Sequence, residues 1–305
     1  MPSLKAIRNR IGSIKNTRKI TRAMKMVSAA KLRRAQEAII AARPYAAALS
    51  KVVSELSAVA GPESHPLFQS HEFNGRKERV ALVLFTSDRG LAGGLNSNVI
   101  KAAERAIRED FAACDVQLRT IGKKSNGHFV RRAGNVVSFD LAPTGPTALT
   151  LARETANVVI DEFMNDKVDR VFVIYNEFKS AISQTVTMKQ VLPVIPEVLT
   201  AAEKAKAIAD TAGHGDKGSI DFIYEPSKNE LLTRLVPQYV QIGLYRAALE
   251  NIASEFGARM TAMENATNNA GDIIGALTLH YNRARQASIT KELLEIIGGA
   301  EALKG

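Results

Sequence analysis

The C-terminal part of the chain carries mainly apolar residues at alternating spacings of four and three. This spacing keeps an apolar stripe on one side of a long helix and is typical of coiled coils. Because no proline follows Pro237, residues 238–305 are predicted to form a helix of about 100 Å, at a rise of 1.5 Å per residue. The stripe comprises Leu235, Tyr239, Ile242, Arg246, Leu249, Ala253, Phe256, Met260, Met263, Thr267, Ala270, Ile274, Leu277 and Tyr281.

The N-terminal part has the same spacing with one interruption. The first ~58 residues are predicted to form one helix of about 85 Å, with an irregular seam near Thr17. A bend is expected at Pro44, because proline removes a helical hydrogen bond. The apolar positions are Leu4, Ile7, Ile11 and Ile14, then Ile20, Met24 and Val27 in a shifted phase, and finally Ala38, Ala42, Tyr45, Leu49, Val52, Leu56 and Val59.

Each stripe needs a facing stripe to exclude water. The two helices are therefore predicted to pair as an antiparallel coiled coil, formed by residues 1–60 and 226–305. Gly243, Gly257 and Gly271 recur every fourteen residues on one face of the second helix. Each costs about 1 kcal/mol relative to alanine. We expect close approach of a partner backbone in return; the alternative is that these glycines are merely tolerated.

Between the two helices, residues 61–225 change to short apolar runs that alternate with helical stretches. This pattern predicts a Rossmann-like α/β domain with a mostly parallel sheet and helices on its faces. Residues 197–219 are rich first in Ala and Lys and then in Gly, which predicts a flexible surface insertion. The expected strands are Val80–Phe85, Val116–Ile121, Val136–Phe139, Val168–Tyr175 and Gln184–Val194, and the expected helices cover about 95–110, 123–133 and 147–164.

Composition narrows the possible classes of protein. The 305 residues are 46% hydrophobic and 24% charged, which excludes wholesale disorder and collagen-like repeats. The single cysteine, Cys114, excludes an internal disulfide framework and a cysteine-rich metal site. No run approaches 18 consecutive apolar residues, so no membrane-spanning helix is predicted.

The positive charge is concentrated at one end. Residues 1–36 contain five Lys, six Arg and no acid, which gives +11, whereas the other 269 residues carry 30 basic and 31 acidic groups. Such a segment indicates an acidic partner: phosphates, an anionic membrane or a carboxylate-rich protein loop. An organelle transit peptide is the alternative, but the helical pattern continues to residue 59 without a cleavage-like break.

None of the catalytic or cofactor-binding motifs that we compared with the sequence matches it fully. The loop Ser87–Asn98 opens a helix after the first strand, but its glycines are spaced Gly-x-x-Gly-Gly and not as a dinucleotide fingerprint. Gly122–Ser125 reads GKKS, but a phosphate loop would need glycine where Gln117 stands. The five histidines form no zinc-binding pair, and no G-x-S-x-G is present. We therefore expect no catalytic, cofactor-binding or metal-ligating residues.

Four segments carry a family resemblance. Residues 14–36, IKNTRKITRAMKMVSAAKLRRAQ, closely resemble the N-terminal helix of the gamma subunit of F-type ATP synthases. Residues 285–300, RQASITKELLEIIGGA, are similar to that family's C-terminal signature. The loop 87–98, SDRGLAGGLNSN, and residues 264–270, ENATNNA, also match it. The resemblance covers essentially the whole chain, with its motifs in the expected order.

The resemblance implies a non-catalytic rotor, present once per complex. Its coiled coil would turn inside a ring of alpha and beta subunits, and its base would rest on the membrane-embedded c-ring beside the epsilon subunit. Rotation would place the three catalytic beta sites in different conformations. The implied location is peripheral, at the cytoplasmic face of the plasma membrane, or at the matrix side in an organelle.

The resemblance also implies contacts for individual residues. A first set on the basic helix would meet an acidic lever loop of the beta subunit, and a second set near the C-terminus would hydrogen-bond other beta-subunit loops. Residues of the central loop would lie near the c-ring or epsilon, and the apolar end of the chain would run in a hydrophobic sleeve. In order, these sets are Lys19, Arg22, Met24 and Lys25; Arg285, Gln286 and Thr290; Ser87, Asp88, Arg89 and Asn96; and Leu293, Leu294, Ile296, Ile297 and Leu303.

Two departures from the family pattern and two rival functions remain. Ala92 stands where some members have cysteine, and the paired-cysteine insertion of chloroplast relatives is missing, which excludes a thiol switch. A nucleic-acid-binding coiled coil would also explain the basic helix, and its duplex affinity would fall steeply with salt. An oxidoreductase that uses the α/β domain is the enzymatic alternative, and bound NAD would identify it. The sequence leaves open whether a coupled ion is a proton or sodium.

Overall fold

The computed structural model describes residues 3–73, 75–132, 134–195 and 227–302. The chain divides into two compact units: Met1–Ala30 with Arg259–Gly305, and Lys31–Ala258. Two long helices run through both units, α1 (Leu4–Ala60) and α6 (Lys228–Ala302). The predicted insertion at 197–219 lies outside the described residues.

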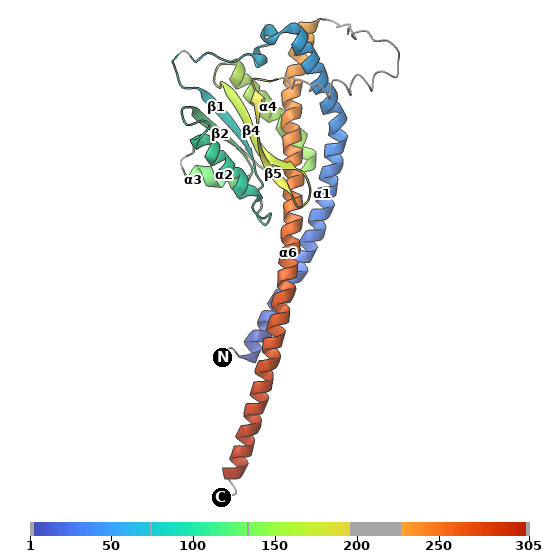
Figure 1. Ribbon diagram of the computed structural model, residues 1–305, viewed down its shortest axis with the longest axis vertical. Helices are drawn as coiled ribbons and strands as arrows, with labels where there is room; N and C mark the ends of the chain where they lie inside the picture. Colours follow the sequence, from blue (N-terminus) through green and yellow to red (C-terminus); the bar gives the residue numbers. More distant parts are fainter. Residues whose placement is uncertain (1–2, 74, 133, 196–226, 303–305) are drawn as a thin grey trace, which may run out of the picture. The chain divides into compact units, whose positions relative to one another are not determined.

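In the first unit, the outer parts of α1 and α6 lie side by side and run in opposite directions (Figure 1). Residues late in this part of α1 pair with residues early in this part of α6, as in the hydrogen bond between Thr21 and Thr267. The α6 stripe from Met260 to Tyr281 is buried or half-buried. The antiparallel coiled coil is confirmed.

The inward face of α1 differs from the prediction. Ile20 and Val27 are 60% and 56% exposed, whereas Thr21 and Ser28, one residue further on in each case, are buried. The three-four spacing that starts at Leu4 therefore continues through Thr21 and Ser28 without a shift. The seam expected near Thr17 is wrong, because polar residues occupy inward positions where apolar residues were sought. Further along α1, Tyr45 and Val52 are also exposed although they were predicted to face inward. Val53, the residue after Val52, is buried.

Both helices contain a proline. α6 begins at Lys228, ten residues before the proline-free stretch that starts at 238, and passes through Pro237. Leu232 and Val236, which both precede Pro237, are fully buried, and burying such a side chain stabilises the fold by about 1.5–3 kcal/mol. That burial offsets the hydrogen bond which proline removes. α1 is likewise one continuous helix across Pro44.

The second unit contains a five-stranded sheet in the order β3-β2-β1-β4-β5. Neighbouring strands are parallel except for the antiparallel hairpin of β4 and β5. The mostly parallel α/β architecture is therefore confirmed. Its strands are β1 (Arg79–Phe85), β2 (Asp115–Ile121), β3 (Val136–Asp140), β4 (Arg170–Phe178) and β5 (Gln184–Leu192), and its helices are α2 (Leu95–Arg108), α3 (Lys123–Arg131) and α4 (Ala148–Met164).

Helices cover both faces of this sheet, with α2 and α3 on one side and α4 on the other (Figure 1). Side chains alternate along a strand, so Val80, Leu82 and Leu84 of β1 face the same side. They form one core with Val99 of α2 and Phe129 of α3. Every residue of β1 from Val80 to Phe85 is at most 1% exposed, as expected for a central parallel strand covered on both faces.

The inner part of α6 packs on the sheet, which is why the second unit extends to Ala258. Asn176 of β4 donates to the Asn251 side chain at 3.2 Å, and Ser254 donates to the Asn176 carbonyl at 2.9 Å. A Cβ added at Gly257 would lie 3.3 Å from the Ala181 Cα. The predicted close approach of another backbone is therefore found at Gly257. The approaching backbone belongs to the β4–β5 hairpin and not to the other long helix.

The other two glycines of the series differ. A Cβ at Gly243 would meet nothing within 4 Å, so this glycine is merely tolerated. A Cβ at Gly271 would lie 3.7 Å from the Arg18 Cζ, so the missing side chain leaves room for a guanidinium and not for a backbone. The fourteen-residue repeat therefore has no single structural cause.

Candidate functional site

The predicted lever-contact residues lie on α1 in the first unit. Lys19 and Arg22 are exposed, and Met24 is half-buried. Lys25 differs, because its ammonium contacts the Glu264 carboxylate of α6 at 2.5 Å. The structure thus presents two of the three predicted basic groups to solvent and pairs the third inside the unit.

The second predicted set lies exposed on α6 and consists of Arg285, Gln286 and Thr290. The structure does not bring it together with the first set. Thr21 pairs with Thr267, so the first set is level with residues near 267 of α6. Arg285 lies eighteen residues further along, or about 27 Å at 1.5 Å per residue. The candidate contacts therefore form two separate sites on this unit.

Beyond Thr290, α6 runs past the N-terminal end of α1 in the same unit (Figure 1). Leu293, Leu294, Ile296 and Ile297 are between 51% and 71% exposed there. Leu303, the last member of this predicted set, lies outside the described residues. A contiguous run of exposed large apolar side chains marks an interaction surface, because solvent-facing helix positions are ordinarily polar.

The central loop, in the second unit, is held by its own side chains. Ser87 is fully buried; its backbone N–H donates to the Asn96 Oδ1 at 2.9 Å, and its hydroxyl donates to the Arg89 carbonyl at 2.6 Å. Asn96 Nδ2 donates back to the Ser87 hydroxyl at 2.8 Å. Two of the four predicted contact residues therefore shape the loop, and Arg89 is exposed.

Asp88 caps the neighbouring helix. Its carboxylate accepts a hydrogen bond from the Lys123 backbone N–H at 2.9 Å, at the first residue of α3, and another from the Ala142 N–H at 3.2 Å. In open α/β sheets ligands bind beyond the carboxyl ends of the strands, and helix N-termini bind their phosphates. Here a carboxylate of the chain itself occupies that place beside Gly122. This arrangement disfavours a nucleotide phosphate at this point.

The same loop holds a residue that sequence reasoning missed. Leu91 is 63% exposed and has a φ of 65°, in the left-handed region that large side chains rarely adopt. Strain of this kind persists only where the surroundings impose it. The sequence gives little indication of this conformation. Only the neighbouring glycines, Gly90, Gly93 and Gly94, indicate an unusual backbone.

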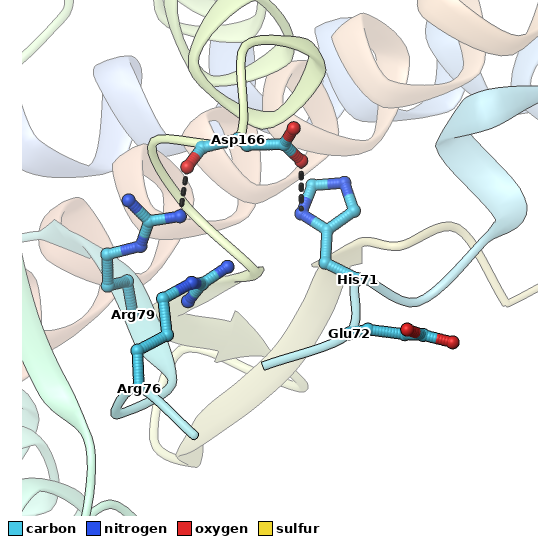
Figure 2. Close-up of a pocket in the computed structure, with 5 residues that line it drawn as sticks. All are labelled: His71, Glu72, Arg76, Arg79 and Asp166. Carbon is cyan, nitrogen blue, oxygen red and sulfur yellow. Dashed lines mark hydrogen bonds and ion pairs between the residues drawn. The ribbon is translucent and has the colours of Figure 1, made fainter. Parts of the chain in front are cut away.

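The structure also has a surface pocket of about 520 Å³ in the second unit, beside the starts of β1 and β4 (Figure 2). The His71 imidazole lies 3.4 Å from a carboxylate oxygen of Asp166. Arg79 donates to the Asp166 backbone carbonyl, and Arg76 and Glu72 complete the lining. Two arginines face several carboxylates here, so the pocket has no strong preference for an anion.

Asp169, at the edge of this pocket, is 1% exposed. It accepts a hydrogen bond from the Arg79 backbone N–H at 2.8 Å and two from the Arg76 guanidinium, and it lies 3.4 Å from the His71 ring. Burial alone would raise the pKa of Asp169, but the hydrogen bonds from Arg76 and Arg79 lower it well below its ordinary value. These contacts anchor the segment before β1 and bring no nucleophile to the pocket.

Within the described residues, no group of three or more His, Cys, Asp or Glu side chains is arranged to hold a metal ion. The same part of the chain contains no helix that is both long and apolar enough to span a bilayer.

Comparisons with known proteins agree with this architecture. A family model described as ATP synthase matches residues 3–303. The ATP synthase gamma chain of Geobacter metallireducens is 46% identical over 312 residues, and that of Anaeromyxobacter dehalogenans is 47% identical over 309. Both alignments cover 100% of each chain.

Solved structures share the fold. A chain of the central stalk and c-ring of Tetrahymena thermophila mitochondrial ATP synthase is 26% identical, with a TM-score of 0.56 over 81% of this chain and 99% of that one. A chain of the Euglena gracilis mitochondrial ATP synthase is 20% identical, with a TM-score of 0.62 over 98% and 94%, and shows the fold alone. Full-length identity near 46%, together with the family match over 3–303, shows that this chain belongs to the ATP synthase gamma-chain family.

Proposed function

We propose that this chain is the single-copy central shaft of an F-type ATP synthase, which transmits rotation of a c-ring to the catalytic beta subunits. The observation that carries the proposal is the antiparallel coiled coil in a chain 46% identical to ATP synthase gamma chains over its full length. An asymmetric shaft favours a different conformation of each surrounding subunit, because it offers each one different contacts. The chain would be non-catalytic, with alpha, beta, epsilon and c-ring subunits as partners.

The charge of α1 supports an acidic partner for the outer part of the shaft. Arg22 and Lys19 are exposed, as are Ile20 and Val27 on the same helix. Exposed cations beside exposed apolar groups suit a carboxylate-bearing protein loop, because the charges orient the encounter and the apolar groups bury area. We assign Lys19, Arg22 and Met24 to a beta-subunit lever loop. Duplex nucleic acid is disfavoured, since phosphate binding would not explain the apolar members.

Arg285, Gln286 and Thr290 form the second proposed beta-subunit contact. Their side chains are exposed, and together they provide five guanidinium donors, an amide and a hydroxyl. We place Arg89 and Leu91, at the exposed edge of the central loop, towards the c-ring or epsilon. With no spanning helix among the described residues, membrane association would come through the c-ring, at the cytoplasmic face of the plasma membrane or at the matrix side.

Two exposed arginines on α6 allow a matched test in an assembled, membrane-reconstituted complex. Arg283 and Arg285 are two residues apart, so they point about 200° away from each other around the helix. Arg285→Glu should lower ATP hydrolysis and ATP-driven proton pumping several-fold, because it replaces a proposed hydrogen-bond donor with a repelling charge. Arg283→Glu is the control and should change either rate by less than twofold. Equal effects of the two substitutions would contradict the assignment of Arg285.

A further inference from the structure

The coiled coil of the first unit buries polar side chains although apolar ones stand beside them. Thr21 and Ser28 are 8% and 3% exposed, whereas the neighbouring Ile20 and Val27 are more than half exposed. A rotation of α1 by one residue would bury isoleucine and valine instead. The same rotation would turn Ile7, Ile11 and Ile14 outward, so apolar burial near the N-terminus opposes it while apolar burial near Thr21 favours it. Around Thr21, polar contacts with α6 accompany the observed orientation.

The first such contact is a hydrogen bond between two threonine hydroxyls. The Thr21 and Thr267 hydroxyl oxygens are 2.7 Å apart, and the Thr267 hydroxyl also lies 2.7 Å from the Met263 carbonyl. Thr267 can therefore donate to Met263 while it accepts from Thr21. The Thr21 hydroxyl also lies 3.1 Å from the Arg18 carbonyl, so each hydroxyl has an acceptor on its own helix. The Thr21–Thr267 contact adds a hydrogen bond between the two helices, worth about 0.5–1.5 kcal/mol.

The second contact is the ion pair of Lys25 and Glu264, 2.5 Å between Nζ and Oε1, one turn further along α1. Its side chains are 38% and 47% exposed, so its net contribution to stability is small, about 0–1 kcal/mol. Its role is to give specificity, because a polar residue at an inward position of a coiled coil selects one register at a cost in stability.

The facing residues share one register. The residue numbers sum to 288 for Thr21 with Thr267, and to 289 for Lys25 with Glu264 and for Arg18 with Gly271. A slip of one heptad in either direction would place Thr21 opposite Ile274 or Met260. The same slips would place Lys25 opposite Gly271 or Gly257, without a counter-charge. Of these three registers, only the observed one pairs Thr21 with a hydroxyl and Lys25 with a carboxylate of α6.

We propose that Thr21–Thr267 and Lys25–Glu264 form a polar lock that sets the register of the coiled coil, so that Lys25 is a positioning residue within the shaft and not a partner contact. The lock keeps Ile20, Arg22 and Val27 on the outer face. Its effect on coupling rests on the proposed function, whereas its effect on register belongs to this chain alone.

Charge exchange tests the lock. The variants are Lys25→Glu, Glu264→Lys and their combination. Each is made in a full-length Cys114→Ala chain that also carries Ile14→Cys and Ile274→Cys, at two positions whose numbers sum to 288. Disulfide formation between these cysteines reports the register. Each single reversal places like charges together and should slow disulfide formation at least threefold, and the combination should restore it to within twofold. Equal disulfide formation in all variants would overturn the proposal.

The same variants in the reconstituted complex separate the two roles of Lys25. If Lys25 acts inside the shaft, the double exchange should restore the ratio of proton pumping to ATP hydrolysis that the single reversals lower. If it meets an acidic partner loop, Lys25→Glu should stay impaired with or without Glu264→Lys, which would overturn the proposal. Lys19→Glu with Glu264→Lys is the matched control, and no restoration is expected there. A third outcome is that disulfide formation depends on these charges while proton pumping is the same in every variant. That result would support the polar lock and contradict the proposed function.

Discussion

Asp169 is predicted to be a main electrostatic anchor of the second unit, and Asp166 provides its control. Both carboxylates lie 3.4 Å from the His71 ring, but the Asp169 side chain is 1% exposed and that of Asp166 is 75% exposed. Replacing each with asparagine removes one charge at nearly constant volume. A comparison of the two variants therefore isolates the effect of burial and of the arginine contacts.

The magnitude follows from the contacts. Removing one partner of a buried ion pair costs about 3–5 kcal/mol when the other charge stays buried. Here Arg76 and Arg79 are 35% and 28% exposed, so water can partly rehydrate them. We therefore expect Asp169→Asn to lower the free energy of unfolding by about 2–3 kcal/mol, at or just below the lower limit of that range. Asp166→Asn should cost less than about 1 kcal/mol, as for exposed pairs.

The effect of Asp169 should also depend on pH. Its pKa is lower in the folded chain than in the unfolded chain, so its contribution is complete above about pH 4, the ordinary value for aspartate. That contribution declines as the pH falls through the folded-state value. Urea unfolding at pH 7 and below pH 4 should show the gap between wild type and Asp169→Asn narrowing in acid. Equal costs for the two variants at pH 7, or a gap that widens in acid, would refute the reasoning.

Glycine positions give the remaining predictions. Gly122→Ala should destabilise the chain by at least about 3 kcal/mol in urea unfolding, because φ is 101° and the new Cβ would lie 2.3 Å from the Thr86 carbonyl oxygen; a cost below about 1 kcal/mol would contradict this. Gly243→Ala should raise the thermal midpoint, since alanine gains up to about 1 kcal/mol in a helix and meets nothing there. Gly257→Ala should lower it, because the Cβ would crowd Ala181; shifts of the same sign would refute the distinction.

The sheet was readily predictable, because its strands are short apolar runs separated by turn residues. β1 begins at Arg79, one residue before the predicted Val80, and β5 begins at the predicted Gln184. Burial on both faces imposes such runs on the sequence directly. The order of the strands and the antiparallel edge depend on pairing between distant segments. They could not be predicted, because local periodicity shows only that strands alternate with helices.

The phase of α1 was not predictable from that helix alone. Thr21 resembles a surface residue until Thr267, 246 positions away, supplies its hydrogen-bond partner. In the same way, nothing in the spacing of the central loop shows that Asn96 turns back to Ser87, or that Asp88 caps another helix. The resemblance correctly indicated the family, but the contacts that it implies for single residues stay predictions. Polar side chains are hard to assign because their roles depend on partners far along the chain.

Arrest of the shaft tests the central claim most directly. Ile20→Cys, on the exposed face of the two-helix region, would be joined by a disulfide to a cysteine in a surrounding subunit of the assembled ATPase, in the Cys114→Ala chain. A rotating shaft predicts that multi-turnover ATP hydrolysis stops in proportion to the cross-linked fraction and returns when the disulfide is reduced. Undiminished hydrolysis at complete cross-linking would contradict rotation of this chain.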